Sequence, residues 1–151
     1  YLHPHRVGLI ENRAGELGFS IISAFQADRP VCNPALGLFD RVLCDVPCSG
    51  LGVMRRRPEI KYKSHNFEEL GAVQHKILQT ASNYCKVGGK LLYSTCTIRP
   101  EENEAVVSRF LQENPGFSPA PLAEDGAARR LILPGEQGGD GFFMAAFVRK
   151  S

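Results

Sequence analysis

The sequence predicts one α/β domain with a mostly parallel sheet that ends in an antiparallel pair. Segments with helical spacing of apolar residues alternate with short apolar runs, which is typical of strands joined by crossover helices. The composition, with 43% hydrophobic and 23% charged residues among 151, is that of a single soluble globular domain. Ligands of such a sheet bind beyond the carboxyl ends of its strands.

The first predicted elements are a helix and two strands. From Pro4, apolar residues recur at helical spacing until Gly18, a typical residue after a helix end. The apolar run 20–25 predicts a strand, with Asp28 just beyond it. A second strand is expected over residues 39–44, followed by a loop.

The middle of the chain predicts an irregular segment followed by a helix. Residues 49–66 are polar and glycine-rich, which is typical of a loop. Apolar residues then recur at helical spacing over 70–81, and Asn66 with Glu69 forms the pattern of a capping box. Gly88 and the glycine after it are expected to end this helix.

The last part predicts a buried strand, a helix and two further strands. Residues 90–94 form the strand, and Pro100 is expected to open the helix, with two acidic residues in its first turn. Residues 114–116 should stop that helix. Strand candidates at 130–133 and 142–148 make up the terminal antiparallel pair.

Composition also indicates the cellular compartment and argues against a metal site. No apolar run reaches the roughly 18 residues that a membrane span requires, and no leader pattern is evident, so we expect a cytoplasmic protein. The five cysteines are an odd number and lack CxxC spacing, which favours a reducing compartment. No metal site is predicted, because Cys44 lies in an apolar run and no histidine near Cys48 completes a ligand set.

Two cysteines fall at predicted strand ends, where ligands of this fold class bind. Cys96 follows one strand and precedes the helix expected at Pro100, whose dipole would favour a thiolate. Cys48 belongs to the loop after another strand, together with Asp45. A reactive thiol and a small buried hydrophobe remain equally open interpretations of each cysteine at this point.

A local basic run follows the first of these loops, although the net charge is only +2. Its members are Arg55, Arg56, Arg57, Lys61 and Lys63. Such a run is either a solvated loop or a contact to phosphates. Gly50 and Gly52 begin a dinucleotide-binding fingerprint, but Arg55 stands where its third glycine should be, so no such site is predicted.

Three strings, in this order, resemble motifs of the Sun family of RNA (cytosine-5)-methyltransferases. They are LCDVPCSGLGVMRRRPEIKYK, GGKLLYSTCTIRPEENEAVV and DGFFMAAF, which match the Pro-Cys motif, the Thr-Cys motif and the closing strand. The opening, LHPHRVGLIENRAGELG, resembles the family's helix after its second strand. The resemblance implies a Rossmann-like S-adenosylmethionine-dependent methyltransferase fold and methylation of cytosine C5 in RNA. Ribosomal RNA is the expected substrate, with transfer RNA as the alternative.

The resemblance also implies a role for each motif residue. Cys96 would attack cytosine C6, and Cys48 would assist release of the product. Asp45 would contact the base edge, Pro47 would shape the turn, and the target base would be swung out of any helix. Asp28 matches the aspartate that contacts the adenine of S-adenosylmethionine, and Asp45 is the second predicted cofactor-binding residue. The basic run would reach RNA phosphates.

Other cofactor-binding features of the family do not match this sequence. The acid that binds the ribose should stand at position 1, where the chain has Tyr1, and the glycine-rich loop would precede it. We therefore expect residues 1–151 to be a partial methyltransferase catalytic domain without the first strand, the glycine-rich loop and the second strand. This piece alone is expected to bind S-adenosylmethionine weakly and to be inactive.

Three alternatives remain open. A DNA cytosine-C5 methyltransferase would use Cys48 of the Pro-Cys motif as its nucleophile. An exocyclic-amine methyltransferase would need an aromatic residue at that position. A protein that kept the fold and lost the chemistry would be a non-catalytic RNA-binding module. The sequence predicts no oligomeric state.

Overall fold

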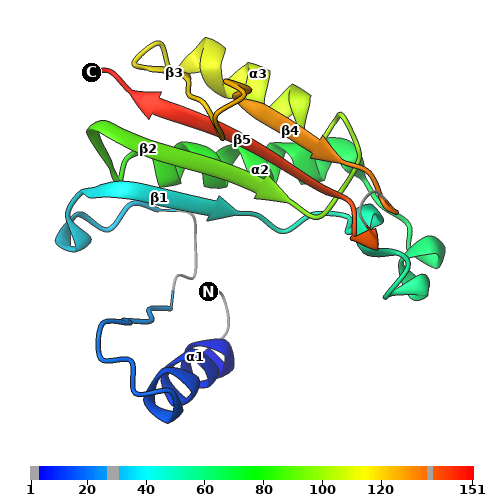
Figure 1. Ribbon diagram of the computed structural model, residues 1–151, viewed down its shortest axis with the longest axis horizontal. Coiled ribbons are helices and arrows are strands. Elements are labelled where there is room, and N and C mark those ends of the chain that lie inside the picture. The colour runs from blue at the N-terminus through cyan, green and yellow to red at the C-terminus, as the bar shows by residue number, and fades with distance from the viewer. Residues whose placement is uncertain (1–3, 27–30, 136–137) are drawn as a thin grey trace. The chain divides into compact units, whose positions relative to one another are not determined.

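The computed structural model describes residues 4–26, 31–135 and 138–151. The chain divides into two compact units, residues 1–31 and residues 32–151. The first unit contains helix α1 (Pro4–Glu16), and the second contains every strand and the other helices of the described residues (Figure 1).

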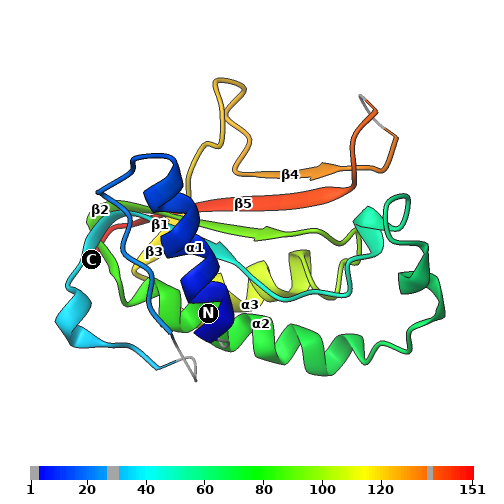
Figure 2. The same ribbon diagram turned by 90° about the horizontal axis from the view of Figure 1, so that it is seen from below.

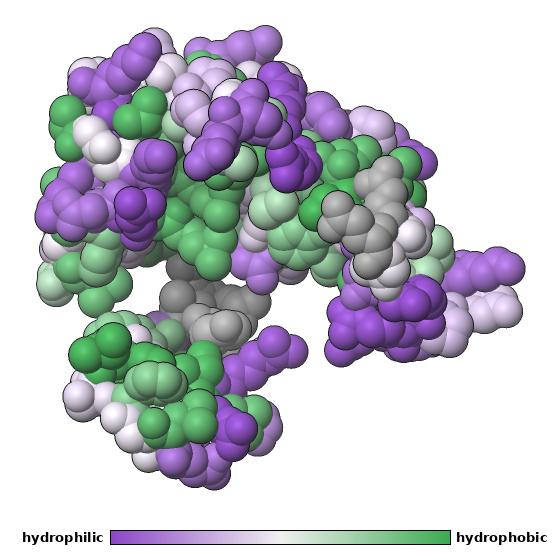
Figure 3. Space-filling view, viewed as in Figure 1, coloured by the Kyte–Doolittle hydropathy of each residue, from purple (hydrophilic) through white to green (hydrophobic). Residues whose placement is uncertain are grey.

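Helix α1 forms where the apolar spacing predicts it. Gly18 ends it as expected, with a φ of 72° that places it in the left-handed region. Ala14 is its one buried residue among those described. Much of the visible surface of this unit is apolar (Figure 3). Its exposed large apolar side chains are Leu9, Leu17, Phe19, Ile21, Ile22 and Phe25.

The strand predicted over residues 20–25 is wrong, because these residues form no strand. A strand needs a neighbour whose backbone groups pair with its own, and no described strand pairs with this segment. Its apolar side chains are consequently exposed, as in Ile21 at 90%. Asp28 lies outside the described residues.

The second unit is built on a five-stranded sheet. Its strands are β1 (Phe39–Asp45), β2 (Cys85–Thr95), β3 (Phe117–Pro119), β4 (Arg129–Ile132) and β5 (Phe142–Arg149). The order is β1-β2-β5-β3, and β4 also pairs with β5. The predicted terminal antiparallel pair is confirmed as β4 and β5.

The expectation of a mostly parallel sheet is wrong for the described residues. Only β1 and β2 run parallel, while β5 is antiparallel to β2, β3 and β4. A parallel pair requires a long crossover, which the helix between β1 and β2 provides. The connection between β4 and β5, residues 133–141, is too short for such a crossover, so that pair is antiparallel.

Helices α2 (Phe67–Ser82) and α3 (Glu104–Glu113) lie on the same face of this sheet (Figures 1 and 2). The core forms between them and the strands. Its fully buried members include Leu78 of α2, Phe110 of α3, and Leu91, Tyr93 and Phe147 of the sheet. This packing fixes the strand ends that carry the predicted site.

Helix α2 begins as predicted and ends earlier than predicted. The side chain of Asn66 accepts a hydrogen bond from the backbone N–H of Glu69 at 3.2 Å, which confirms the cap. The helix stops at Ser82, before Gly88. Gly88 and Gly89 belong to β2, where a Cβ on Gly89 would come within 3.1 Å of the Asp40 carbonyl oxygen. Gly89 therefore permits close strand pairing, and neither glycine ends the helix.

Helix α3 begins at Glu104, not at the predicted Pro100, and residues 100–103 form a turn. Asn103 explains the difference, because its side chain is buried and bonded to the end of β2. Its Nδ2 donates to the Thr97 carbonyl at 3.1 Å, and its Oδ1 accepts from Thr95 Oγ1 at 2.7 Å. These bonds hold Asn103 at φ −112°, ψ −89°, outside helical geometry.

The segment 49–66 is irregular, as predicted. It contains two 3-10 helices, η2 (Leu51–Val53) and η3 (Pro58–Tyr62), and η1 (Pro34–Leu36) precedes β1. Ile60 is an apolar anchor of the segment, only 7% exposed. Within the part of the chain that the structure describes, no helix is both long and apolar enough to cross a membrane.

Candidate active site

The two cysteine loops start from neighbouring strand ends, as predicted. Asp45, the last residue of β1, pairs in register with Ser94 of β2. Ser94 Oγ donates to Asp45 Oδ1 at 3.0 Å, and the N–H of Val46 donates to the Ser94 carbonyl at 3.3 Å. Both loops therefore leave the same edge of the sheet.

The loops bring Cys48 and Cys96 into direct contact. Their sulfur atoms lie 3.1 Å apart, and both side chains are half-buried. The hydrogen bond from Cys48 lowers the pKa of Cys96 to about 7, against an opposing effect of burial. The same contact and the burial of Cys48 raise the pKa of Cys48. The pair thus favours a thiolate on Cys96 beside a protonated Cys48.

The physical origin of this acidity differs from the predicted one. Helix α3 begins eight residues after Cys96, so the dipole of a helix opening at Pro100 does not act on this thiol. The hydrogen bond from Cys48 replaces it as the main cause. Cys44 is a contrasting thiol: burial and the nearby Asp45 charge raise its pKa to about 12.

A buried polar network beneath the cysteines was not predicted. Its centre is the carboxyl group of Glu102, which is fully buried and bonded to Ser49, Gln74 and Thr97. One sequence signal could have indicated it. Gln74 lies on the apolar stripe of the predicted helix 70–81, four residues after Leu70 and four before Leu78, where a polar residue needs a buried partner.

Gly52 joins the cysteine loops to the start of β5. Its N–H donates to the Cys96 carbonyl at 3.0 Å, and its own carbonyl accepts from the N–H of Gly141 at 2.8 Å. A Cβ on Gly52 would stand 2.2 Å from the Gly141 oxygen, so only glycine fits. Gly52 therefore permits the close backbone packing of this loop against Gly141.

Asp45 and Pro47 occupy the exposed rim of the site. Among the described residues, Asp45 Oδ2 has no hydrogen-bond partner, so this carboxylate is able to accept a bond from an amino group of a ligand. The carbonyl of Pro47 accepts from Gln74 Nε2 at 3.0 Å, which fixes the turn before Cys48. Of the two predicted cofactor-binding residues, Asp45 lies on this rim, and Asp28 lies outside the described residues.

The basic run divides into two groups. Arg55 donates to the carbonyl of Gly138 at 3.1 Å, and Arg56 forms a 2.5 Å ion pair with Asp140. These arginines hold the loop before β5. Arg57, Lys61 and Lys63 are exposed and have no ion-pair partner among the described residues. Figure 3 shows hydrophilic side chains gathered over the segment that contains η2 and η3.

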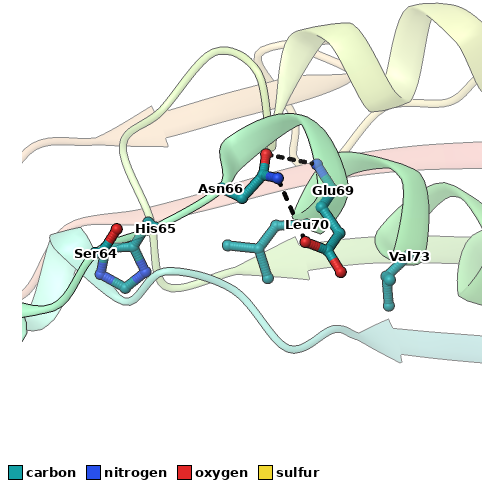
Figure 4. A pocket seen from close by; sticks show the side chains of 6 residues that line it. All are labelled: Ser64, His65, Asn66, Glu69, Leu70 and Val73. Carbon is teal, nitrogen blue, oxygen red and sulfur yellow. Dashed lines mark hydrogen bonds between the residues drawn. The ribbon is translucent and has the colours of Figure 1, made fainter.

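A separate pocket opens at the start of α2 (Figure 4). Its lining residues are Ser64, His65, Asn66, Glu69, Leu70 and Val73. The close-up shows the Asn66 cap bonded to Glu69 at its rim. None of the residues predicted for catalysis, cofactor or RNA lines this pocket, so the cysteine pair remains the candidate site.

Comparison with known proteins agrees with this geometry. The profile of the family described as 16S rRNA methyltransferase RsmB/F matches residues 2–148. The chain is 39% identical over 165 aligned residues to a probable ribosomal RNA small subunit methyltransferase B of Bacillus subtilis, covering 99% of this chain and 36% of that protein. The chain thus spans about a third of the length of this relative.

Solved structures share the fold. The crystal structure of PH0851 superposes with a TM-score of 0.89 at 26% identity, over 99% of this chain and 36% of that one. NSun6 from Pyrococcus horikoshii, solved with SFG, superposes with a TM-score of 0.82 at 24% identity, over 99% and 40% respectively. The predicted Rossmann-like fold is confirmed, and the chain belongs to the RsmB/F family of 16S rRNA methyltransferases.

Proposed function

We propose that this chain carries the catalytic cysteines of an enzyme that methylates cytosine C5 in small-subunit ribosomal RNA, with S-adenosylmethionine as methyl donor. The observation that supports it most directly is the pair of sulfur atoms 3.1 Å apart, with the pKa of Cys96 lowered to about 7. A cysteine that is partly thiolate at neutral pH is suited to covalent catalysis. The name of the Bacillus subtilis relative supports ribosomal RNA as the substrate.

The chemistry assigns one step to each cysteine. The Cys96 thiolate adds to C6 of the cytosine, and the electron pair of the C5–C6 bond makes C5 nucleophilic. When bound, S-adenosylmethionine supplies the methyl group that C5 accepts. A base then removes the C5 proton, the C5–C6 double bond re-forms, and the Cys96 sulfur leaves as a thiolate. Protonated Cys48, hydrogen-bonded to that sulfur, stabilises the departing thiolate and so assists product release.

Asp45 would hold the reactants at the rim of this site. Its Oδ1 is fixed by Ser94, and its Oδ2 faces no described partner. The carboxylate would accept a hydrogen bond from the exocyclic amine of cytosine, or from an amino group of the cofactor. Pro47, fixed by Gln74, would keep the loop in the turn that presents Cys48.

Residues 1–151 alone are proposed to be a partial catalytic domain that binds S-adenosylmethionine weakly and is inactive. The support is that they span about a third of the related protein and provide one described cofactor-binding candidate, Asp45. We propose a cytoplasmic location for the enzyme, where its thiols stay reduced.

The alternatives use the same residues differently. A DNA-type enzyme would attack with Cys48, but its raised pKa makes it the weaker nucleophile of the pair. A non-catalytic module would have no use for an acidified Cys96. Both alternatives predict that no 5-methylcytidine forms in RNA.

The protein at its natural length is expected to convert cytidine to 5-methylcytidine in small-subunit ribosomal RNA transcribed in vitro, when S-adenosylmethionine is supplied. Digestion to nucleosides and mass spectrometry identify the product. Matched reactions with transfer RNA and with DNA duplex test the substrate class. Product only on DNA, methylation only on the exocyclic amine, or no product on any nucleic acid would contradict the proposal.

Arg57, Lys61 and Lys63 are proposed to contact RNA phosphates, because they are exposed and follow the Cys48 loop. Changing all three to alanine is expected to reduce the slope of log binding constant against log salt by about 0.7 for each phosphate of single-stranded RNA that is no longer neutralised. Binding of the ribosomal RNA is measured by titration at several salt concentrations. The control is Arg55→Ala, whose side chain is bonded to Gly138 and should leave the slope nearly unchanged. Equal slopes for the wild type and the triple variant would exclude these contacts.

A further inference from the structure

We propose that Glu102 is a positioning residue that clamps the two cysteine loops together and so sets the contact between Cys48 and Cys96. The proposal rests on the proposed function only for its catalytic consequence. The contact between the sulfur atoms can be measured without any methyl transfer.

The carboxyl group of Glu102 receives four hydrogen bonds from protein groups. Its Oε2 accepts from the backbone N–H of Ser49 at 2.9 Å and from Gln74 Nε2 at 2.9 Å. Its Oε1 accepts from Ser49 Oγ at 2.5 Å and from Thr97 Oγ1 at 3.1 Å. A carboxylate offers about four acceptor sites, so these donors fill its capacity.

These bonds join two loops that are distant in sequence. Ser49 directly follows Cys48, and Thr97 directly follows Cys96. Their hydroxyl oxygens lie 2.9 Å apart, and both bond the same carboxyl oxygen of Glu102. Each cysteine is therefore one residue away from a common buried anchor.

Two further contacts lie around this carboxyl group. Gln74 of α2 donates both to Glu102 and to the carbonyl of Pro47, which lies on the other side of Cys48. The backbone carbonyl of Glu102 accepts from Tyr93 OH at 2.6 Å. Cys48 is thus held from both flanking residues, and the carboxyl group is unable to shift without breaking buried bonds.

The clamp explains the local irregularity of the chain. A helix that opened at Pro100 would carry Glu102 in its first turn, whereas the observed turn 100–103 places this side chain in the core. A buried carboxyl group is costly unless its hydrogen bonds are satisfied. In this chain the carboxyl group is buried, with its hydrogen bonds satisfied, at the point where both cysteine loops meet.

The test measures the thiol contact by oxidation with diamide in the protein at its natural length, without RNA or cofactor. In the wild type, the Cys96 thiolate adds to the N=N bond of diamide, and Cys48 then displaces the reduced hydrazine to form a disulfide. Glu102→Ala should form this disulfide at least about tenfold more slowly, because the effective concentration of one thiol near the other falls. Glu102→Gln keeps the shape of the side chain, so its rate of disulfide formation should lie between those of the wild type and Glu102→Ala.

Tyr93→Phe is the matched control, since it deletes a buried hydrogen bond to the Glu102 backbone and leaves the carboxyl group in place. A merely structural role for Glu102 predicts that Glu102→Gln and Tyr93→Phe lower the melting temperature alike while both keep the wild-type disulfide rate. That result would overturn the clamp. The clamp would also be overturned if Glu102→Ala folds and forms the disulfide at the wild-type rate.

Failure of the clamp and failure of the proposed function are distinguishable. If disulfide formation depends on Glu102 while the wild type methylates no RNA, the clamp stands and the proposed function fails. If the wild type methylates RNA and the Glu102 variants keep both the disulfide rate and the turnover, the function stands and the clamp fails.

Discussion

Cys96→Ser is expected to abolish covalent trapping of RNA that carries 5-fluorocytidine at the target position, whereas Cys48→Ser is expected to retain it. Fluorine at C5 cannot leave as a proton, so the bond between sulfur and C6 persists once it has formed. A serine hydroxyl is far less ionised than a thiol of pKa about 7, and turnover should fall by about 10³-fold or more.

The two variants are matched, because each removes one sulfur of the same 3.1 Å pair. Covalent complexes are counted by denaturing gel electrophoresis after incubation with the cofactor. Cys85→Ser, at a thiol of the core cluster, is a further control that should trap as the wild type does. An adduct that survives in Cys96→Ser and disappears in Cys48→Ser would assign the attack to Cys48, as in a DNA-type enzyme.

The sequence predicted the parts of the fold that local patterns determine. The cap at Asn66, the strand before Asp45 and the strand pair at the C-terminal end follow from turn chemistry and apolar periodicity. Local patterns failed where tertiary partners decide. The run 20–25 has the apolar character of a strand and no described neighbour, so it forms none.

The sequence predicted the two cysteines of the site but not the buried residues that hold them in place. Cys48 and Cys96 stand at strand ends, and the parallel pairing of β1 and β2 brings such ends together. The role of Glu102 depends on bonds to Ser49, 53 residues away in the chain, which no local pattern indicates. Arg55 and Arg56 looked like part of one basic surface, but residues 138 and 140 engage them from a distant loop.

Cys48→Ala is expected to shift the pH at which Cys96 becomes reactive from about 7 toward the ordinary value of about 8.5. The shift follows because the hydrogen bond from Cys48 is the main cause of the lowered pKa, and alanine has no donor. Because a thiol is an acid, its thiolate is present above the pKa and is lost as the pH falls through the pKa. The variant should therefore need more alkaline solution to react.

Alkylation with iodoacetamide across pH measures this shift in the protein at its natural length. Tryptic peptide 91–109 contains Cys96 as its only cysteine, so mass spectrometry follows this thiol alone. The midpoint is the quantity to compare, because the rate at pH 7 combines two opposing effects. The thiolate fraction falls from about half to about 3%, while a more basic thiolate is about fivefold more nucleophilic.

Cys48→Ser separates the hydrogen bond from the sulfur atom. A serine hydroxyl still donates to the Cys96 thiolate, so its midpoint should lie between those of the wild type and Cys48→Ala. If all three proteins share one midpoint near 7, Cys48 does not acidify Cys96, and the backbone N–H of Cys96 becomes the hydrogen-bond donor that lowers the pKa of its thiol. In that outcome Cys48 acts on product release alone, and the Cys48 variants should differ from the wild type only after the adduct has formed.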